Sequence, residues 1–165
     1  MDRKLVRAAA RAHLHSGLSI ASHTSGGAPA ALGQLELLND EGVHPSAWIW
    51  VHAQIERDNE LHVQLARRGA WVEFDGIRPA TIDRHVDLVR TMKRHDVLDR
   101  VLISQDAGWY HVGEAQGGEI RPFDTLFTEF LPALQRANFS EADIERLLVV
   151  NPREALSIRV RRQEA

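Results

Sequence analysis

The sequence predicts an α/β fold in which four parallel strands alternate with helices. Two observations lead to this prediction. A helix, a short turn, an apolar strand and a polar residue follow one another four times, and no linker or low-complexity tract interrupts the series. Strands and helices that alternate at this spacing form parallel sheets with right-handed crossovers. We therefore expect a single domain over residues 1–165, a length that suffices to bury a core.

Each helix is expected where apolar residues recur at helical spacing. The expected helices cover residues 2–16, 30–41, 58–68 and 80–95. Glycine, which favours the position just past a helix end, follows the first three of them. The remainder of the chain is expected to form a loop at the rim of the sheet over residues 107–121 and C-terminal helices over residues 122–165, with the short Arg-rich tail as a solvated helix end.

The strand-like runs lie between residues 18 and 106 and read LSIASH, AWIWVH, AWVEFD and VLISQD. Near-continuous apolar runs of this kind are typical of strands that helices cover. Because Trp48, Trp50 and Trp71 lie inside these runs, we expect them in the core.

Composition excludes several classes of function. Apolar residues make up 44% of the chain and charged residues 26%, and the net charge of −3 offers no basic excess for a nucleic acid. Because the chain has no cysteine, it has no disulfide, thiolate metal site or cysteine nucleophile. No apolar run is long enough to span a membrane and the first residues do not resemble a secretory signal, so the expected location is the cytoplasm.

The four strands end on polar residues that are candidates for one site: His23, His52, Asp75 and Asp106. Parallel strands place their carboxyl ends on a common edge, where α/β proteins build their sites. Two imidazoles and a carboxylate are a suitable ligand set for a divalent metal such as Zn²⁺. His23, His52 and Asp106 are therefore predicted to be metal ligands. The alternative is that these side chains only end strands and bond to loop backbone.

The other histidines are not expected to bind metal. His13 and His15 form an H-x-H pair, but residues two apart on a helix diverge by about 200°, so a shared metal is not expected. His62, His85 and His95 fall within predicted helices and are expected to be exposed.

The loop after the fourth strand is a candidate substrate-contacting element, because long loops at a strand edge often carry function. It contains Trp109 and Tyr110 directly after Asp106. These aromatic side chains are predicted either to contact substrate or to pack the loop onto the rim. The glycine-rich stretches SGGAPA and GEAQGG lack the spacing of a phosphate-binding loop.

Several of these segments together resemble the phosphotriesterase-like family of the amidohydrolase superfamily. The resemblance rests on LSIASHTSGG, WIWVHAQ, WVEFDGI, LISQDAGWYHVGE and the C-terminal stretch RPFDTLFTEFLPALQRANFSEADIERLLVVNPREAL, which occur in the family's order and spacing. It implies a (β/α)8 TIM barrel with two metals, usually zinc, bridged by hydroxide, and it covers the second half of that barrel.

The resemblance also implies roles for individual residues. His23 and His52 match the metal histidines of the fifth and sixth strands. Asp106 matches the eighth-strand aspartate, which binds the other metal and takes a proton, and is the predicted catalytic residue. Asp75 matches an acidic position near the substrate pocket. The implied reaction is attack of metal-bound hydroxide on an ester, lactone or phosphotriester.

The sequence departs from the family pattern in ways that affect this expectation. The first-strand H-x-H and the bridging fourth-strand lysine have no counterpart, and a relay histidine of some members is Gly76 here. At most one weakly held metal is therefore expected. Half a barrel also exposes strand edges and an apolar face, which predicts association. The chain is expected to act with a copy of itself or with a complementary N-terminal half-barrel. The alternative is a non-catalytic remnant that serves as a metal-binding or assembly module.

Overall fold

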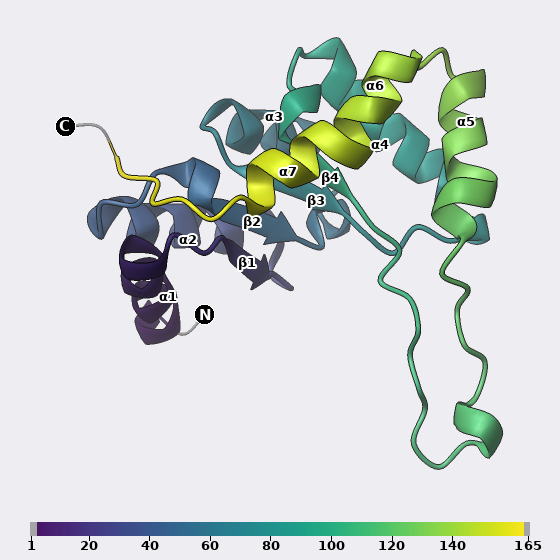
Figure 1. The fold of residues 1–165 in the computed structure, drawn as a ribbon, viewed down its shortest axis with the longest axis horizontal. Helices are drawn as coiled ribbons and strands as arrows, with labels where there is room; N and C mark the ends of the chain where they lie inside the picture. Colours follow the sequence, from purple (N-terminus) through teal and green to yellow (C-terminus); the bar gives the residue numbers. More distant parts are fainter. Residues whose placement is uncertain (1–2, 164–165) are drawn as a thin grey trace.

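The computed structural model describes residues 3–163, and it confirms the predicted fold class (Figure 1). Four strands form one parallel sheet in the order β1-β2-β3-β4. Their bounds are Ile20–His23 (β1), Trp48–Val51 (β2), Trp71–Phe74 (β3) and Val101–Ile103 (β4). Because the strands run parallel and in sequence order, all four carboxyl ends lie on one edge.

Seven α-helices accompany the sheet in the described part of the chain. They are α1 (Arg3–Ser16), α2 (Gly27–Asp40), α3 (Asn59–Arg67), α4 (Ile82–Arg94), α5 (Leu131–Arg136), α6 (Glu141–Glu145) and α7 (Asn151–Leu156). Short 3₁₀ turns link them: η1 (Pro45–Ala47), η2 (Ala53–Ile55), η3 (Pro79–Thr81), η4 (Leu98–Arg100) and η5 (Ala115–Gly117). Two π-helical turns, η6 (Leu126–Phe130) and η7 (Arg146–Val150), lead into α5 and α7.

Local sequence explains where several helices begin. The Asp58 carboxylate accepts a hydrogen bond from the Glu60 N–H at 3.0 Å and so caps α3. Ser140 and Asp143 form a reciprocal capping box at the start of α6. Helix α2 begins at Gly27, three residues earlier than the periodicity predicts. The Glu56 side chain accepts a hydrogen bond from the Ala28 N–H at 3.0 Å, which supplies a partner for this first turn.

The two faces of the sheet pack against different elements. On one face Trp48, Trp50 and Phe74 are fully buried in the main core with residues of α2, α3 and α4. On the other face Trp71 and Leu102 form a smaller cluster with residues of α7, and Figure 1 shows α7 crossing the sheet there. The expected burial of the three strand tryptophans is thus confirmed.

Two histidines that the sequence placed on exposed helix positions are buried, and that prediction is wrong. His62 is 1% and His85 2% exposed, because α3 and α4 turn these positions toward the sheet. The His62 Nε2–H donates to the Ala53 carbonyl oxygen across 2.8 Å, while its Nδ1 is buried and has no hydrogen-bond partner within residues 3–163. Burial lowers the pKa of His62 below its usual value.

This burial makes stability depend on pH. The pKa of His62 is about 6.5 in an unfolded chain and lower in the folded one. As the pH falls through 6.5, the unfolded state therefore binds more protons than the folded state does. We expect the unfolding free energy to decrease between pH 7 and pH 5, with His62 contributing up to about 1.4 kcal/mol per pH unit. His62→Gln should reduce this slope in urea titrations, whereas His15→Ala, an exposed position on α1, should retain it. Equal slopes in all three proteins would contradict the assignment.

The C-terminal tail is extended rather than helical. Helix α7 ends at Leu156, and the Arg159 N–H then donates to the Gly17 carbonyl oxygen at 3.0 Å. Gly17 has φ 74°, and a Cβ there would lie 2.9 Å from the Arg159 backbone, so glycine is required for this approach. Arg161 is buried, and its N–H donates to His13 Nε2 at 2.9 Å. The Arg-rich tail is therefore an extended segment and not the expected helix end, with Arg161 buried and Arg159 and Arg162 exposed as expected.

His13, the first histidine of the H-x-H pair in α1, has a structural role because both of its ring nitrogens contact backbone groups. Its Nδ1 lies 2.8 Å from the Leu18 carbonyl oxygen, and its Nε2 accepts from Arg161. Both ring nitrogens are thereby engaged, and His15 is exposed. His13 therefore links the end of α1 to the C-terminal segment.

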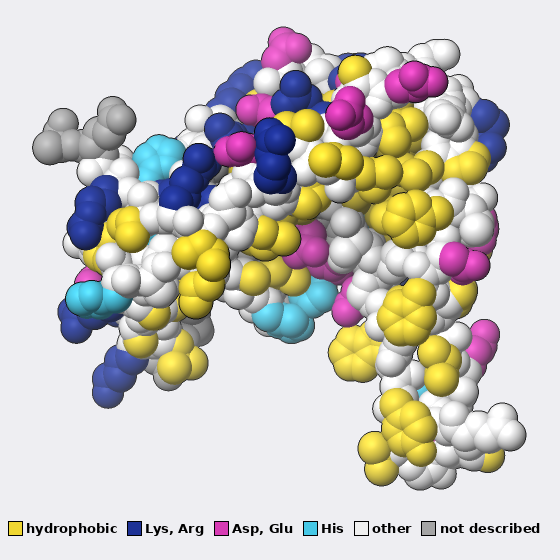
Figure 2. Space-filling model, viewed as in Figure 1, with side chains coloured by type: hydrophobic (Ala, Val, Ile, Leu, Met, Phe, Trp, Pro, Cys, Tyr) yellow, Lys and Arg dark blue, Asp and Glu magenta, His cyan; other side chains and the backbone are white. Residues whose placement is uncertain are grey.

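The segment between β4 and α5 projects from the body of the molecule (Figure 1). Its apolar side chains are visible on the projection in Figure 2. Trp109 and Tyr110 are 54% and 68% exposed, and Val112 is 92% exposed. The aromatic pair does not pack onto the sheet rim in this structure.

Candidate metal centre

Two residues that follow strands have a positive φ. His52 follows β2 with φ 64°, and Asp106 lies beyond β4 with φ 45°. Both values fall in the left-handed region, which histidine and aspartate enter more readily than most residues do. Because Asp96, Gln116 and Asn138 also have a positive φ, this conformation does not by itself identify a site. His52 and Asp106 differ from these three in lying at the carboxyl edge of the sheet.

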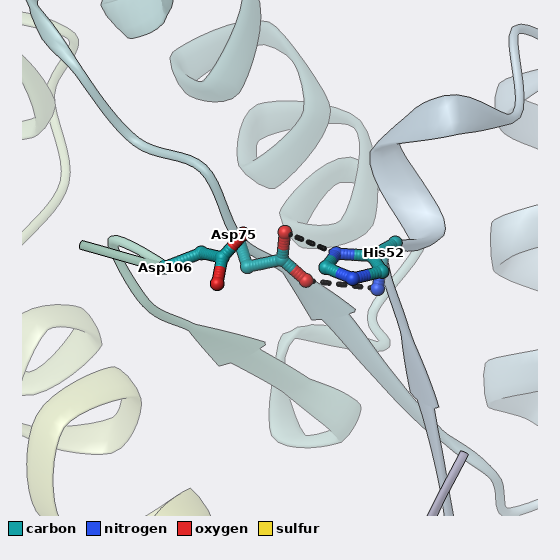
Figure 3. A group of neighbouring side chains, drawn as sticks. All are labelled: His52, Asp75 and Asp106. Atoms are coloured by element: carbon teal, nitrogen blue, oxygen red, sulfur yellow. Dashed lines mark hydrogen bonds and ion pairs between the residues drawn. The ribbon is translucent and has the colours of Figure 1, made fainter. Parts of the chain in front are cut away.

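His52, Asp75 and Asp106 form the compact group at this edge. One potential ligand atom from each residue lies within 4.8 Å of the other two. Figure 3 shows Asp75 between His52 and Asp106, with the three side chains coming from the ends of β2, β3 and β4. Asp75 is almost fully buried, with 2% of its side chain exposed, whereas the His52 side chain is 16% and Asp106 37% exposed. The group thus has its buried side at Asp75 and its most solvent-exposed side at Asp106.

The Asp75 carboxylate fixes the orientation of His52. Its Oδ1 lies 2.6 Å from His52 Nδ1, and its Oδ2 accepts from the His52 backbone N–H at 2.8 Å. A carboxylate beside Nδ1 retains the hydrogen there, so Nε2 is the nitrogen with a free lone pair. Histidines that bind metals are usually oriented by this kind of carboxylate contact. Asp75 is therefore suited to positioning His52.

Further polar groups that the sequence analysis did not identify hold Asp75. Gln54 Nε2 donates to Asp75 Oδ1 at 2.6 Å, and the Asp75 N–H donates to Gln54 Oε1 at 3.1 Å. His85 Nε2 lies 2.8 Å from the Asp75 carbonyl oxygen. The only available signal was the position of Gln54 two residues after His52. His85 belongs to a helix whose orientation no local pattern predicts.

His23 lies next to this group at the end of β1. Its ring meets the ring of His52 edge to face, with centroids 4.3 Å apart. The backbone register pairs His23 with Val51, so the two histidines lie on neighbouring strand ends. The structure therefore brings His23 and His52 side by side. Figure 2 shows histidine and acidic side chains adjoining along this edge of the body.

The remaining predicted site residues lie around Asp106. Trp109 Nε1 donates to the Asp106 carbonyl oxygen at 3.0 Å, which ties the start of the projecting segment to the site. Arg121 returns from that segment, with its Nη2 3.9 Å from the Asp106 carboxylate. Tyr110 lies further along the segment, against Gly117. Of the two aromatic residues, Trp109 thus has a direct contact with a residue of the group.

Glu73 adds an acidic side chain that the sequence did not suggest as part of the site. It lies in β3, two residues before Asp75, and is half-buried. Burial raises the pKa of its carboxyl group, and the Asp75 carboxylate raises it further. Glu73 consequently retains a proton to higher pH than a solvated glutamate does.

The side chains present fit a divalent cation. His52 Nε2 has no hydrogen-bond partner among residues 3–163, and the Asp106 carboxylate has only the long contact with Arg121. A neutral imidazole nitrogen and an anionic oxygen are donors that Zn²⁺ and related ions accept. His52 and Asp106 would hold such an ion, with His23 as a further imidazole nearby and Asp75 orienting His52.

Among the described residues, no helix is both long enough and apolar enough to cross a bilayer.

Comparison with known proteins identifies curated relatives of similar sequence. The phosphotriesterase homology protein of Escherichia coli K12 is 30% identical over 155 residues, which are 92% of this chain and 52% of that protein. The N-acetyltaurine hydrolase of Dictyostelium discoideum is 24% identical over 95% of this chain and 46% of its own length. The chain spans about half the length of the curated relatives it matches.

Solved structures of similar proteins also match most of this chain and about half of their own length. The crystal structure of the Escherichia coli phosphotriesterase homology protein, complexed with phosphate in the active site, matches 91% of this chain and 52% of its own with a TM-score of 0.77 and 29% identity. A resiniferatoxin-binding protein from Rhodobacter sphaeroides matches 96% of this chain and 48% of its own with a TM-score of 0.80 and 28% identity.

The sequence model of the phosphotriesterase family matches residues 1–156, and therefore nearly the whole chain. This match agrees with the strand-end histidines and aspartates and with the half-length correspondence to solved structures. The chain belongs to the phosphotriesterase family of the amidohydrolase superfamily and corresponds to about half of its barrel.

Proposed function

We propose that this chain forms the metal-binding second half of a hydrolase in which water attacks a small-molecule ester, lactone or phosphotriester. The observation that carries the proposal is the group of His52, Asp75 and Asp106 at the carboxyl edge of a parallel sheet. That edge is where α/β barrels place their catalytic groups. The cytoplasm is the proposed location.

The exposure and the contacts of each residue suggest a different role for it in the proposed reaction. His52 would bind the cation through Nε2, and Asp75, buried and hydrogen-bonded to Nδ1, would maintain the tautomer this requires. Asp106, which is more exposed, would bind the cation and accept a proton from the attacking water. When bound, a divalent cation lowers the pKa of water toward about 7 and polarises the oxygen of a carbonyl or phosphoryl group.

Zinc is the proposed metal. Imidazole and carboxylate together are a common zinc ligand set, and the chain has no thiolate that would favour softer ions. Because His52 and Asp106 supply one ligand each and His23 is a neighbouring imidazole, we expect one weakly held ion per isolated chain.

The proposal also includes a partner. In the part of the chain that the structure describes, β1 and β4 each pair with a strand on one side only. Eight strands close the smallest α/β barrels, so a second copy of this chain or a complementary N-terminal half would complete the site. A small-molecule substrate would then bind at the closed rim.

Metal-dependent hydrolysis of model substrates tests the function. Purified chain is incubated with Zn²⁺ or Co²⁺ and assayed on an aryl ester, a γ-lactone and an aryl phosphotriester. Hydrolysis above the buffer rate is expected, and chelation with EDTA should abolish it. Asp75→Asn should weaken Zn²⁺ affinity about 10- to 100-fold, because loss of an orienting carboxylate has an effect of this size. Asp83→Asn removes an acidic charge from the exposed start of α4 and serves as the control.

Two results would count against this function. Unchanged zinc affinity in Asp75→Asn would show that the ion does not bind through His52. Zinc binding without hydrolysis, both by the chain alone and with the complementary half of a relative, would identify the chain as a non-catalytic metal-binding module.

A further inference from the structure

A cavity of about 420 Å³ opens beside the metal group, and arginine is prominent in its lining. His52, Asp75 and Asp106 form part of its wall. Gln54, Ile55, Gly76, Thr81 and His85 also line it. The other lining residues are four arginines from the segments that follow β2, β3 and β4: Arg57, Arg78, Arg84 and Arg121. Three successive loops of the functional edge thus each contribute a guanidinium group to one cavity.

The cavity lining carries more positive than negative side chains. Among the described residues, the acidic ones that line it are Asp75 and Asp106, and these belong to the metal group. Arg121 faces Asp106 at the long distance of 3.9 Å. Arg84 donates to the backbone carbonyl oxygens of Gln54 and Glu56, which are neutral.

Arg57 and Arg78 are the two cavity arginines whose guanidinium groups contact no acidic side chain among residues 3–163. Both are exposed, and within residues 3–163 neither forms an ion pair with a carboxylate. A cation at the metal group would add two further positive charges beside them. Like charges gathered in one cavity repel, and an anion that enters it relieves the repulsion. Guanidinium groups also match carboxylate and phosphate oxygens with paired hydrogen bonds.

We propose that the cavity selects substrates with a permanent anionic group, such as a carboxylate, sulfonate or phosphate, separate from the bond that is broken. This inference rests on the proposed hydrolase function and names its substrate class. Arg57 and Arg78 bind the anionic group, Arg84 supports the cavity wall through its carbonyl contacts, and the scissile bond lies toward His52 and Asp106. A neutral ester, lactone or triester would leave these guanidinium groups without a partner.

The first experiment measures anion binding without any reaction. Metal-free chain in EDTA is titrated with inorganic phosphate and, separately, with acetate at constant ionic strength, and amide shifts are followed by NMR. Saturable binding is expected to shift residues of the cavity. Arg57→Ala combined with Arg78→Ala should weaken it at least about tenfold, because hydrogen bonds to charged groups are lost. Tighter binding of phosphate or of acetate shows whether a tetrahedral or a planar anion is preferred.

The control is matched in charge and in location on the fold. Arg67→Ala combined with Arg68→Ala removes two exposed arginines from the far end of α3, outside the cavity. This variant should bind phosphate like the unmodified chain. An equal loss in both double variants would show general charge attraction, and it would overturn the proposal, as would a lack of saturable binding.

The second experiment separates the inference from the function on which it rests. The metal-loaded chain is assayed on 4-nitrophenyl hydrogen succinate and on its methyl ester, which differ in one negative charge. We expect a lower KM for the charged ester, and the Arg57/Arg78 double variant should lose this preference. If neither ester is hydrolysed by the chain alone or with the complementary half of a relative, but phosphate still binds through the two arginines, the hydrolase proposal fails and the anion site stands. If both esters are hydrolysed equally and the double variant has no effect, the hydrolase stands and the anion site fails.

Discussion

Replacing His52 with alanine is expected to reduce zinc affinity by more than about a hundredfold, a larger loss than removal of an orienting carboxylate produces. His52 supplies the imidazole of the group and lies between Asp75 and the ring of His23. Its removal also leaves the buried Asp75 carboxylate without its Nδ1 partner. Hydrolysis, which depends on the ion, should fall to the rate of buffer. Zinc content after dialysis and the initial rate on an aryl ester measure the two effects.

The backbone at His52 calls for a second variant. Because φ is 64° at this position, alanine introduces strain that could itself lower stability. Asparagine tolerates the left-handed region and lacks an imidazole, so His52→Asn separates loss of the ligand from loss of folding. His15→Ala, which removes an exposed imidazole from α1, is the control. A His52→Asn protein that folds normally and retains full zinc affinity would refute the metal assignment.

Self-association of the isolated chain is the second large effect that we expect. The outer edges of β1 and β4 have no partner strand among residues 3–163, and Leu18, just before β1, is 56% exposed. Open strand edges beside apolar surface favour pairing with another chain. Sedimentation velocity at about 10 µM, a concentration at which exposed edges and apolar surface already drive association, should give a mass near twice the 18.6 kDa of one chain.

A charge placed at the open edge tests this expectation. Ala21 is exposed in β1, and Ala21→Lys should shift the population toward monomer because edge lysines oppose strand pairing. Ala12→Lys, at an exposed position of α1, should not change the mass. A monomer at all concentrations would exclude pairing with a second copy, and the complementary N-terminal half would then be the partner to test.

Local sequence determined the elements and the edge on which the site lies. The alternation of helix and strand predicted a four-stranded parallel sheet, and that topology alone requires His52, Asp75 and Asp106 to end on the same edge. Apolar runs also predicted the burial of Trp48 and Trp50. These features depend on residue order and on the period of each element, which a single chain displays directly.

Only the tertiary structure decided which polar side chains are buried and which of them meet. Helical period shows which residues share a face, but the neighbouring elements decide whether that face is covered, so His62 and His85 could not be assigned from their own helices. The contact of Asp75 with His52 depends on the pairing of β2 with β3. The meeting of Arg57 and Arg78 in one cavity likewise depends on how successive loops converge. Such contacts join residues about 20 positions apart or more, and their geometry is set by packing rather than by any local pattern.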